Sequence, residues 1–313
     1  MEIFRGSDRV GGKTRGCILT IGNFDGIHLG HRALLDAVMR SGRAQGRPAA
    51  VYTFDRHPRR VLQPGSPVPR LMSPAQMEWA LESAGVDILI VEPFTAELAG
   101  LPAPDFIEQI LIGRIGPSEV VVGRDFRFGR GRSGSDETLQ EHLPASGVQV
   151  DVIAQVLVEG RDVSSTRIRG LLAEGQVEEV TRCLGRPYAL WGTVIAGDRR
   201  GRQLGFPTAN LDPDDELIPA RGVYATTVER LEHGRPDGVT RLAVTNVGTR
   251  PTFEPGQLMA ETHLLDFEGD LYGARLALSF HARLRDEQRF SGPDELRAQI
   301  ARDAAAAREV LAG

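Results

Sequence analysis

Between residues 16 and 185, apolar runs alternate with segments whose apolar residues recur at helical spacing. In the first helical segment, Leu34, Leu35 and Val38 share one face, and a glycine ends the pattern. Continuous apolar strands separated by amphipathic helices predict an α/β fold, a parallel sheet covered by helices on both faces. The expected strands are 16–24, 48–54, 86–94, 118–123 and 148–154, and the expected helices are 31–46, 73–85 and 103–116.

The pattern changes near Gly185, beyond which the apolar segments are short and separated by turn residues. Such spacing is typical of an antiparallel sheet or barrel. A helix with Pro293 near its start follows at the C-terminal end. We therefore expect two domains, at 1–185 and 186–313. The short β-like segments are 188–197, 222–231, 240–248, 258–267 and 274–284.

Composition and charge narrow the class of protein. The chain has 313 residues, which fits two domains of about 100–200 residues each. Its formal net charge of -5 argues against a nucleic-acid binder that works through bulk positive charge. No apolar run reaches the length of a membrane span, and the polar N-terminus does not resemble a signal peptide, so we expect a cytoplasmic protein. Cys17 and Cys183 form no CxxC pair, and neither a disulfide framework nor a zinc site is indicated.

Two glycine-rich segments resemble nucleotide-binding loops without fitting them. Residues 11–14 read GGKT, yet Ser7 stands where a P-loop requires glycine, and the segment precedes a strand instead of following one. Residues 129–134 match GxGxxG, yet RDFRF separates them from the preceding strand. We interpret the first as a polar turn and the second as a loop that can contact anions.

The first expected strand runs into GNFDGIHLGH at 22–31, where two histidines and three glycines precede a helix. Ligands of α/β sheets bind at the carboxyl ends of strands, and the N-terminus of the next helix offers N–H groups to phosphate. His28 and His31 lie three residues apart, so they share one side of a helical start and can donate hydrogen bonds to a phosphoryl group. The alternatives are a satisfied buried histidine and a two-histidine metal site, for which no further ligand stands nearby.

This stretch resembles the HxGH motif of the nucleotidylyltransferase superfamily, which implies a Rossmann-like, doubly wound parallel sheet. SSTRIR at 164–169 is similar to the partner motif of that superfamily, although taken alone it fits an ordinary helix cap equally well. Two further segments, TFDRHP at 53–58 and VVVGRDFRFG at 120–129, lie between these two motifs in the chain. Together these motifs resemble the adenylyltransferase half of prokaryotic FAD synthetases, which are also riboflavin kinases.

The resemblance implies that the phosphate of FMN attacks the α-phosphate of ATP, and an anionic nucleophile requires no strong base. His28 and His31 would assist at the α-phosphate, while Ser164, Thr166 and Arg169 would hold the departing pyrophosphate. The remaining nucleotide-binding candidates are Gly22, Asn23, Phe24, Asp25, Gly26, Gly30 and Ser165. The flavin-binding candidates are Asp125, Phe126 and Phe128, although phenylalanines are as often part of a core.

FAD synthetases of this kind carry a kinase module, and the second half of the chain resembles it. Residues 197–211 are similar to the module's glycine-rich turn and its Pro-Thr-Ala-Asn motif, and ETHLLDFEGDLYG follows at 261–273. The resemblance extends from Arg15 to Ala307. One departure is Arg56, which stands where the family usually has the first proline of F-x-P-H-P and can reshape the loop near the adenylyl site.

In the kinase half, the resemblance implies a loop over ATP at Gly201 and Gly205. It also implies that Thr208 and Asn210 bind Mg²⁺ and phosphate, and that Glu261 is the general base for the riboflavin 5'-hydroxyl. The alternation of side chains along this strand does not decide whether Glu261 is a general base or an ordinary solvated carboxylate. Further candidates for contacts with the flavin or the nucleotide are Arg283 and Arg285.

The sequence therefore predicts a bifunctional enzyme of FMN and FAD biosynthesis that uses ATP as co-substrate and Mg²⁺ as cofactor. The alternatives are a kinase whose adenylyltransferase half is degenerate, a nucleotidylyltransferase for another small phosphate acceptor, and a non-catalytic flavin-binding protein. A proton acceptor together with phosphate-binding residues argues against a mere binder. The expected partners are riboflavin, FMN and ATP, with no nucleic acid and no membrane, and a homo-oligomer stays open.

Overall fold

Packing divides the chain into two compact units. The computed structural model describes residues 1–63, 65, 68–196, 206–249 and 258–312. The first unit comprises Met1–Val68 and Met77–Val163, and the second comprises Pro69–Gln76 and Ser164–Gly313. Helices α7 (Ser165–Ala173) and α8 (Val177–Leu184) therefore pack in the second unit, ahead of the expected boundary at residue 186. The domain division drawn from the sequence stays a prediction.

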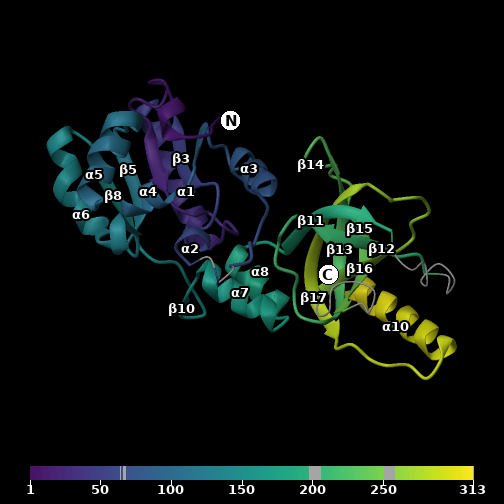
Figure 1. Ribbon diagram of the computed structural model, residues 1–313. Helices are drawn as coiled ribbons and strands as arrows, with labels where there is room; N and C mark the ends of the chain where they lie inside the picture. The colour runs from purple at the N-terminus through teal and green to yellow at the C-terminus, as the bar shows by residue number, and fades with distance from the viewer. Residues whose placement is uncertain (64, 66–67, 197–205, 250–257, 313) are drawn as a thin grey trace. The chain divides into compact units, whose positions relative to one another are not determined.

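The first unit contains a parallel sheet between helices (Figure 1). Within the described residues, six strands pair in the order β1-β4-β3-β2-β5-β8, and all these pairings are parallel. The expected doubly wound sheet is confirmed, but the edge strand β1 was not predicted, because three residues carry no readable pattern. The strands are β1 (Glu2–Phe4), β2 (Ile18–Ile21), β3 (Ala49–Phe54), β4 (Ile88–Glu92), β5 (Glu119–Gly123) and β8 (Gln149–Ile153).

Alternate residues of β2 enter hydrophobic cores on the two sides of this sheet. Ile18 packs with α1 (Leu29–Gln45), and Leu19 packs with η2, a π-helix at Phe106–Ile115. Both faces are thereby covered, and the polar strand ends are left for ligand chemistry. The other elements before residue 164 are η1 (Ser7–Arg9), α2 (Pro58–Leu62), α3 (Pro74–Ser83), α4 (Ala96–Gly100), α5 (Ala103–Asp105), β6 (Arg127–Phe128), η3 (Arg130–Arg132), β7 (Gly134–Ser135), α6 (Asp136–His142), η4 (Leu143–Ser146), β9 (Leu157–Val158) and β10 (Arg161–Asp162).

The second unit contains a closed antiparallel barrel. In the part of this unit that the structure describes, the strand order is β14-β13-β15-β16-β12-β11-β17, and a further pairing of β13 with β17 closes the barrel. The expected barrel and terminal helix are confirmed, and that helix, α10 (Pro293–Ala312), is yellow in Figure 1. The strands are β11 (Tyr188–Ile195), β12 (Ala209–Pro213), β13 (Gly222–Glu232), β14 (Arg235–Pro236), β15 (Arg241–Thr249), β16 (Leu258–Leu264) and β17 (Arg275–Arg285).

The barrel interior is filled by its own side chains. Three buried threonine hydroxyls form a chain across it, with oxygen distances of 2.8 Å between Thr226 and Thr245 and 3.0 Å between Thr245 and Thr262. On the outside, Ala307 of α10 packs with Val244 of β15.

Two expectations from composition concern membranes and thiols. None of the helices among the described residues has the length and apolar character needed to cross a bilayer. Cys17 and Cys183 are free and buried, and burial raises the pKa of the Cys17 thiol to about 12. Across the described ranges, no three His, Cys, Asp or Glu side chains group as they would around a metal ion.

Candidate functional site

The chain leaves β2 through a turn with an unusual backbone. Phe24 and Ile27 have φ of 46° and 40°, in the left-handed region that side chains other than glycine rarely adopt. Phe24 is fully buried, and its packing holds the turn in this conformation. A Cβ at Gly30 would lie 3.1 Å from the His28 ring, so glycine lets the ring lie against the helix start. The turn places His28 at the carboxyl end of β2.

Two histidine rings stack at the start of α1. The ring centroids of His28 and His31 lie 3.8 Å apart, with 16° between the ring planes. Nδ1 of His28 accepts a hydrogen bond from the backbone N–H of His31 at 3.3 Å, which caps the helix. A neutral imidazole carries one hydrogen, so this contact assigns the hydrogen of His28 to Nε2 and makes that atom a donor.

Burial keeps His31 uncharged. Desolvation lowers the pKa of His31 well below its ordinary value of 6.5, and charge repulsion from His28 lowers it further. Nδ1 of His31 is buried and has no hydrogen-bond partner within the described residues. Because buried polar atoms are costly to leave unpaired, a polar ligand at this position would supply the missing contact. The pair therefore offers hydrogen bonding to a ligand without offering a strong base.

The neighbouring strand brings a carboxylate to the same edge of the sheet. The strand order reverses between β2 and β5, because β3 and β4 extend the sheet on one side and β8 on the other. Ligands of α/β folds bind at the carboxyl ends of strands where this reversal occurs. Asp125 follows β5, and its Oδ1 would lie 3.1 Å from a Cβ at Gly123, so the side chain folds back over the strand end. Asp125 and the histidine turn thus lie at neighbouring strand ends.

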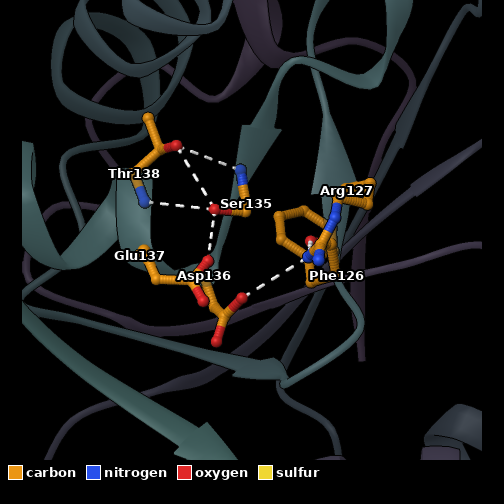
Figure 2. Close-up of polar contacts among 6 residues, drawn as sticks. All are labelled: Phe126, Arg127, Ser135, Asp136, Glu137 and Thr138. Atoms are coloured by element: carbon orange, nitrogen blue, oxygen red, sulfur yellow. Dashed lines mark hydrogen bonds and ion pairs between the residues drawn. The ribbon is translucent and has the colours of Figure 1, made fainter.

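The two phenylalanines that follow Asp125 differ in exposure. Phe128 is 8% exposed and belongs to the core, and Phe126 stacks on it with centroids 5.4 Å apart and remains partly exposed. Figure 2 shows the polar contacts beside Phe126, where Arg127 contacts Asp136 and Ser135 caps α6; the Arg127–Asp136 distance is 3.4 Å. Of the two rings, Phe126 is the one with surface left for a ligand.

The SSTRIR motif forms the first turns of α7, in the second unit. The Ser164 hydroxyl accepts a hydrogen bond from a first-turn N–H at 3.2 Å, so the helix cap that the sequence left open is present. Ser165 and Thr166 follow in the first turn, where the helix dipole favours anions. Nε of Arg169 donates to the Pro69 carbonyl at 2.8 Å, which fixes the plane of its guanidinium group.

On the barrel, polar side chains of three neighbouring strands stand in one row. Glu261 of β16 is directly opposite Asn210 of β12 and, on its other side, opposite Asn246 of β15. Opposed residues of antiparallel strands point to one face with Cβ atoms about 4.5–5.5 Å apart, so the carboxylate lies between two amides. Asn246 was not among the predicted site residues, because the pairing of distant strands cannot be read from local spacing.

The turn before β12 is fastened beside β16. Nδ1 of His263 donates a hydrogen bond to the Pro207 carbonyl at 2.9 Å. The ring of Phe206 packs edge-on against the same imidazole, with the ring centroids 5.3 Å apart. These contacts hold the Pro-Thr-Ala-Asn motif next to the strand that carries Glu261. Gly201 and Gly205, for which a loop over ATP was predicted, lie outside the described residues.

Mg²⁺ takes oxygen ligands, and it usually keeps several waters and phosphate oxygens beside one or two protein groups. Thr208 stands directly before β12 and supplies a hydroxyl, and Asn210 of β12 supplies an amide oxygen. This donor set fits a Mg²⁺ ion that is bound together with phosphate.

The two β17 arginines nominated for flavin contacts are engaged by protein groups. Arg285 forms two hydrogen bonds with the Asp303 carboxylate of α10, at 2.9 and 2.7 Å, and that carboxylate is buried. Arg283 donates to the Arg221 carbonyl at 2.6 Å and pairs with Asp286 at 2.9 Å. These contacts fasten α10 and the loop before β13 to the barrel. A part in flavin binding stays a prediction for both residues.

Comparison with known proteins accounts for both halves of the chain. The family model for FAD synthetase matches residues 11–167, and the family model for riboflavin kinase matches residues 184–311. The bifunctional riboflavin kinase/FMN adenylyltransferase of Pseudomonas fluorescens is 38% identical over 100% of this chain and 98% of its own length. The chain belongs to this family.

Further bifunctional riboflavin kinase/FMN adenylyltransferases are similar over nearly the full length. The Escherichia coli K12 relative is 37% identical and covers 99% of this chain and 97% of its own. A solved chain from Streptococcus pneumoniae, described as a macrolide-efflux protein, has the same fold with a TM-score of 0.88. It is 30% identical, and the match covers 98% of each chain.

Every predicted site residue except Arg169 lies within one of the two family matches, and Arg169 lies between them. His28 and His31 lie within the FAD synthetase match, and Asn210 and Glu261 lie within the riboflavin kinase match. The histidine pair and the row of polar side chains on the barrel therefore correspond to the two named halves of the bifunctional family.

Proposed function

We propose that this chain catalyses both reactions for which its family is named. It phosphorylates riboflavin to FMN, and it transfers an adenylyl group from ATP to FMN, giving FAD and pyrophosphate. The observation that carries the proposal is the presence of two chemically different sites in one chain. The histidine pair offers hydrogen bonds without a strong base, which suits an anionic nucleophile. Glu261 offers a carboxylate between two amides, which suits a hydroxyl nucleophile.

In adenylyl transfer, an oxygen of the FMN phosphate forms a bond to the α-phosphorus of ATP while the bond to pyrophosphate breaks. Negative charge grows on the non-bridging oxygens of the α-phosphate during this exchange. The Nε2–H of His28 donates a hydrogen bond to one of these oxygens, and His31 supplies a second contact. Ser164, Thr166 and Arg169 hold the departing pyrophosphate, as hydroxyls and a guanidinium at a helix start are suited to do.

The remaining contacts of the adenylyltransferase half are proposed from position. The turn between β2 and α1 approaches the nucleotide through its backbone, because its glycines leave room. Asp125 and Phe126 border the flavin, since one lies at the end of β5 and the other keeps exposed ring surface.

In the kinase reaction, the 5'-hydroxyl of riboflavin forms a bond to the γ-phosphorus of ATP while the bond to ADP breaks. The hydroxyl proton passes to the carboxylate of Glu261. Asn210 and Asn246 flank that carboxylate and orient it. Mg²⁺ held near Thr208 and Asn210 would offset the charge of the phosphates.

We further propose that the enzyme works in the cytoplasm, since both reactions consume ATP and its two thiols are free and buried. A homo-oligomer stays a prediction, which light scattering of the purified protein tests.

The test of the proposed function is a time course of flavins. Purified protein is incubated with riboflavin, ATP and Mg²⁺, and the flavins are separated by chromatography. We expect FMN first and FAD later. FMN alone would support the kinase with a degenerate adenylyltransferase half, and bound but unchanged riboflavin would support a binding protein.

A further inference from the structure

Residues 69–76 belong in sequence to the middle of the first unit but pack in the second. We call them the clasp segment. Its Arg70 carbonyl accepts a hydrogen bond from the Leu217 N–H at 2.8 Å, and its Pro69 carbonyl accepts one from Nε of Arg169, also at 2.8 Å. The clasp segment is thus bound on one side by the loop between β12 and β13 and on the other by α7.

A single buried carboxyl group joins the clasp segment to the barrel. Glu216 is 6% exposed, and both of its oxygens are used. Oε1 accepts a hydrogen bond from the Ser73 N–H, and Oε2 accepts one from the Trp191 N–H of β11, each at 2.7 Å. Both donors are backbone groups, so the carboxyl group fixes the main chain of the clasp segment against the main chain of a barrel strand.

The environment of Glu216 makes these two contacts costly to lose. Burial raises the pKa of Glu216 to about 8, although its two backbone donors favour the ionised form. Leu71 and Met72 of the clasp segment are also buried, at 2% and 3% exposure. Water therefore has little access to take over a lost contact, and a missing acceptor leaves a buried N–H unpaired.

The first residue of the clasp segment, Pro69, contacts Arg169, the arginine that is proposed to hold pyrophosphate. A guanidinium group is planar, so a hydrogen bond at Nε sets the direction in which its two terminal nitrogens point. We propose that Glu216, a residue of the riboflavin kinase half, is a positioning residue for adenylyl transfer. It fixes the clasp segment, and the Pro69 carbonyl of that segment fixes Arg169. This inference rests on the proposed role of Arg169.

The test begins with Glu216→Gln, which keeps the size of the side chain but leaves one acceptor oxygen for two N–H donors. In the full-length protein, we expect kcat/KM for FAD formation from FMN to fall by about 10- to 100-fold, as for other displaced catalytic groups. FMN formation from riboflavin should be unchanged. The matched control is Glu232→Gln, an exposed glutamate at the end of β13, which should alter neither reaction.

A double-mutant cycle with Arg169→Met separates positioning from mere fastening. If Glu216 acts through Arg169, adding Glu216→Gln to Arg169→Met causes no further loss of FAD formation. Fully multiplicative losses would overturn the inference, and so would an equal loss of both activities in Glu216→Gln. If Arg169→Met alone leaves FAD formation intact, the proposed role of Arg169 fails, and the inference fails with it. A loss in Arg169→Met without a loss in Glu216→Gln would refute the positioning role alone.

Discussion

The histidine turn and the polar row on the barrel are built in opposite ways. In the first unit, His28 and His31 lie within one turn of helix, and the backbone of the preceding residues shapes the site. In the second unit, Asn210, Asn246 and Glu261 come from three separate strands, and strand register alone brings them together. One site depends on a turn held in an uncommon conformation, and the other depends on a regular sheet.

The difference follows the chemistry that each site is proposed to perform. An anionic nucleophile needs positioned hydrogen-bond donors, and the stacked histidine pair, in which desolvation keeps His31 uncharged, supplies them. A hydroxyl nucleophile must lose a proton, and the half-buried carboxylate of Glu261 can accept it. Changes confined to one of these two sites should therefore affect one reaction and spare the other.

The largest effect is expected from removing the proton acceptor of the barrel. Glu261→Gln keeps the shape of the side chain but not its basicity, so FMN formation should fall by about 10²- to 10⁴-fold. FAD formation from supplied FMN should be unchanged. Initial rates measured by chromatography check both values, with Glu268→Gln, an exposed glutamate just beyond β16, as the control. An equal loss of both reactions would show that the two sites are not separate.

The reciprocal change removes a hydrogen-bond donor from the histidine turn and leaves the barrel unaltered. Asparagine at position 28 can still cap α1 but cannot place a donor where Nε2 lies, so His28→Asn should preserve folding. We expect FAD formation from FMN to fall by about 10²- to 10³-fold, with FMN formation unchanged. His142→Asn, an exposed histidine at the end of α6, is the matched control. Full activity in His28→Asn would remove this residue from the mechanism.

The pH dependence of stability should differ between the two units. Below 6.5 the unfolded chain protonates His31 while the folded chain does not, so this residue lowers stability as the pH falls. Glu216 has the opposite sign. Its pKa is raised from 4.5 to about 8, so its stabilising contribution is complete below 4.5 and is lost as the pH rises through 8.

The free energy of unfolding, measured in urea below pH 6.5 and above pH 8, checks the direction of both pH dependences. His31→Gln should reduce the loss of stability on the acid side, and Glu216→Gln should reduce it on the alkaline side. A variant that flattens the opposite limb of the profile would contradict the assignment of that residue.

The smallest effect is expected at the position where the chain departs from its family's usual motif. Arg56 pairs with Asp55 at 3.0 Å, but the arginine side chain is 56% exposed. Asp55 is also held by the Phe94 N–H, at 2.9 Å. Arg56→Ala should therefore cost less than about 1 kcal/mol of stability, with little change in FAD formation. A large rise in the KM for ATP would instead show that this arginine contacts the nucleotide.

How far the sequence alone could predict each site follows from the same contrast. The histidine pair could be found because its residues are contiguous and follow an apolar run. Glu261 could be nominated by resemblance, but its flanking Asn246 depends on a register between strands that local spacing does not encode. Glu216 is one of several acidic residues in a loop, and only the fold shows that two backbone N–H groups converge on it.

The fold shows a similar limit. The alternation of apolar runs and helical segments predicted both the parallel sheet and the barrel, because each pattern extends over many residues. Strand β1 is too short to leave a pattern, and the π-helical hydrogen bonding of η2 does not change which residues are apolar. The packing of the clasp segment in the second unit depends on contacts across a long sequence separation.

Complementation between two inactive variants tests most directly the central claim that the two reactions occur at two separate sites. Glu261→Gln and His28→Asn are each incubated with riboflavin, ATP and Mg²⁺, alone and mixed, and FAD is followed by chromatography. We expect little FAD from Glu261→Gln, FMN without FAD from His28→Asn, and FAD from the mixture, because released FMN reaches the intact histidine site of the other variant. A mixture that forms FMN but no FAD, while Glu261→Gln still converts supplied FMN, would contradict the independence of the two sites.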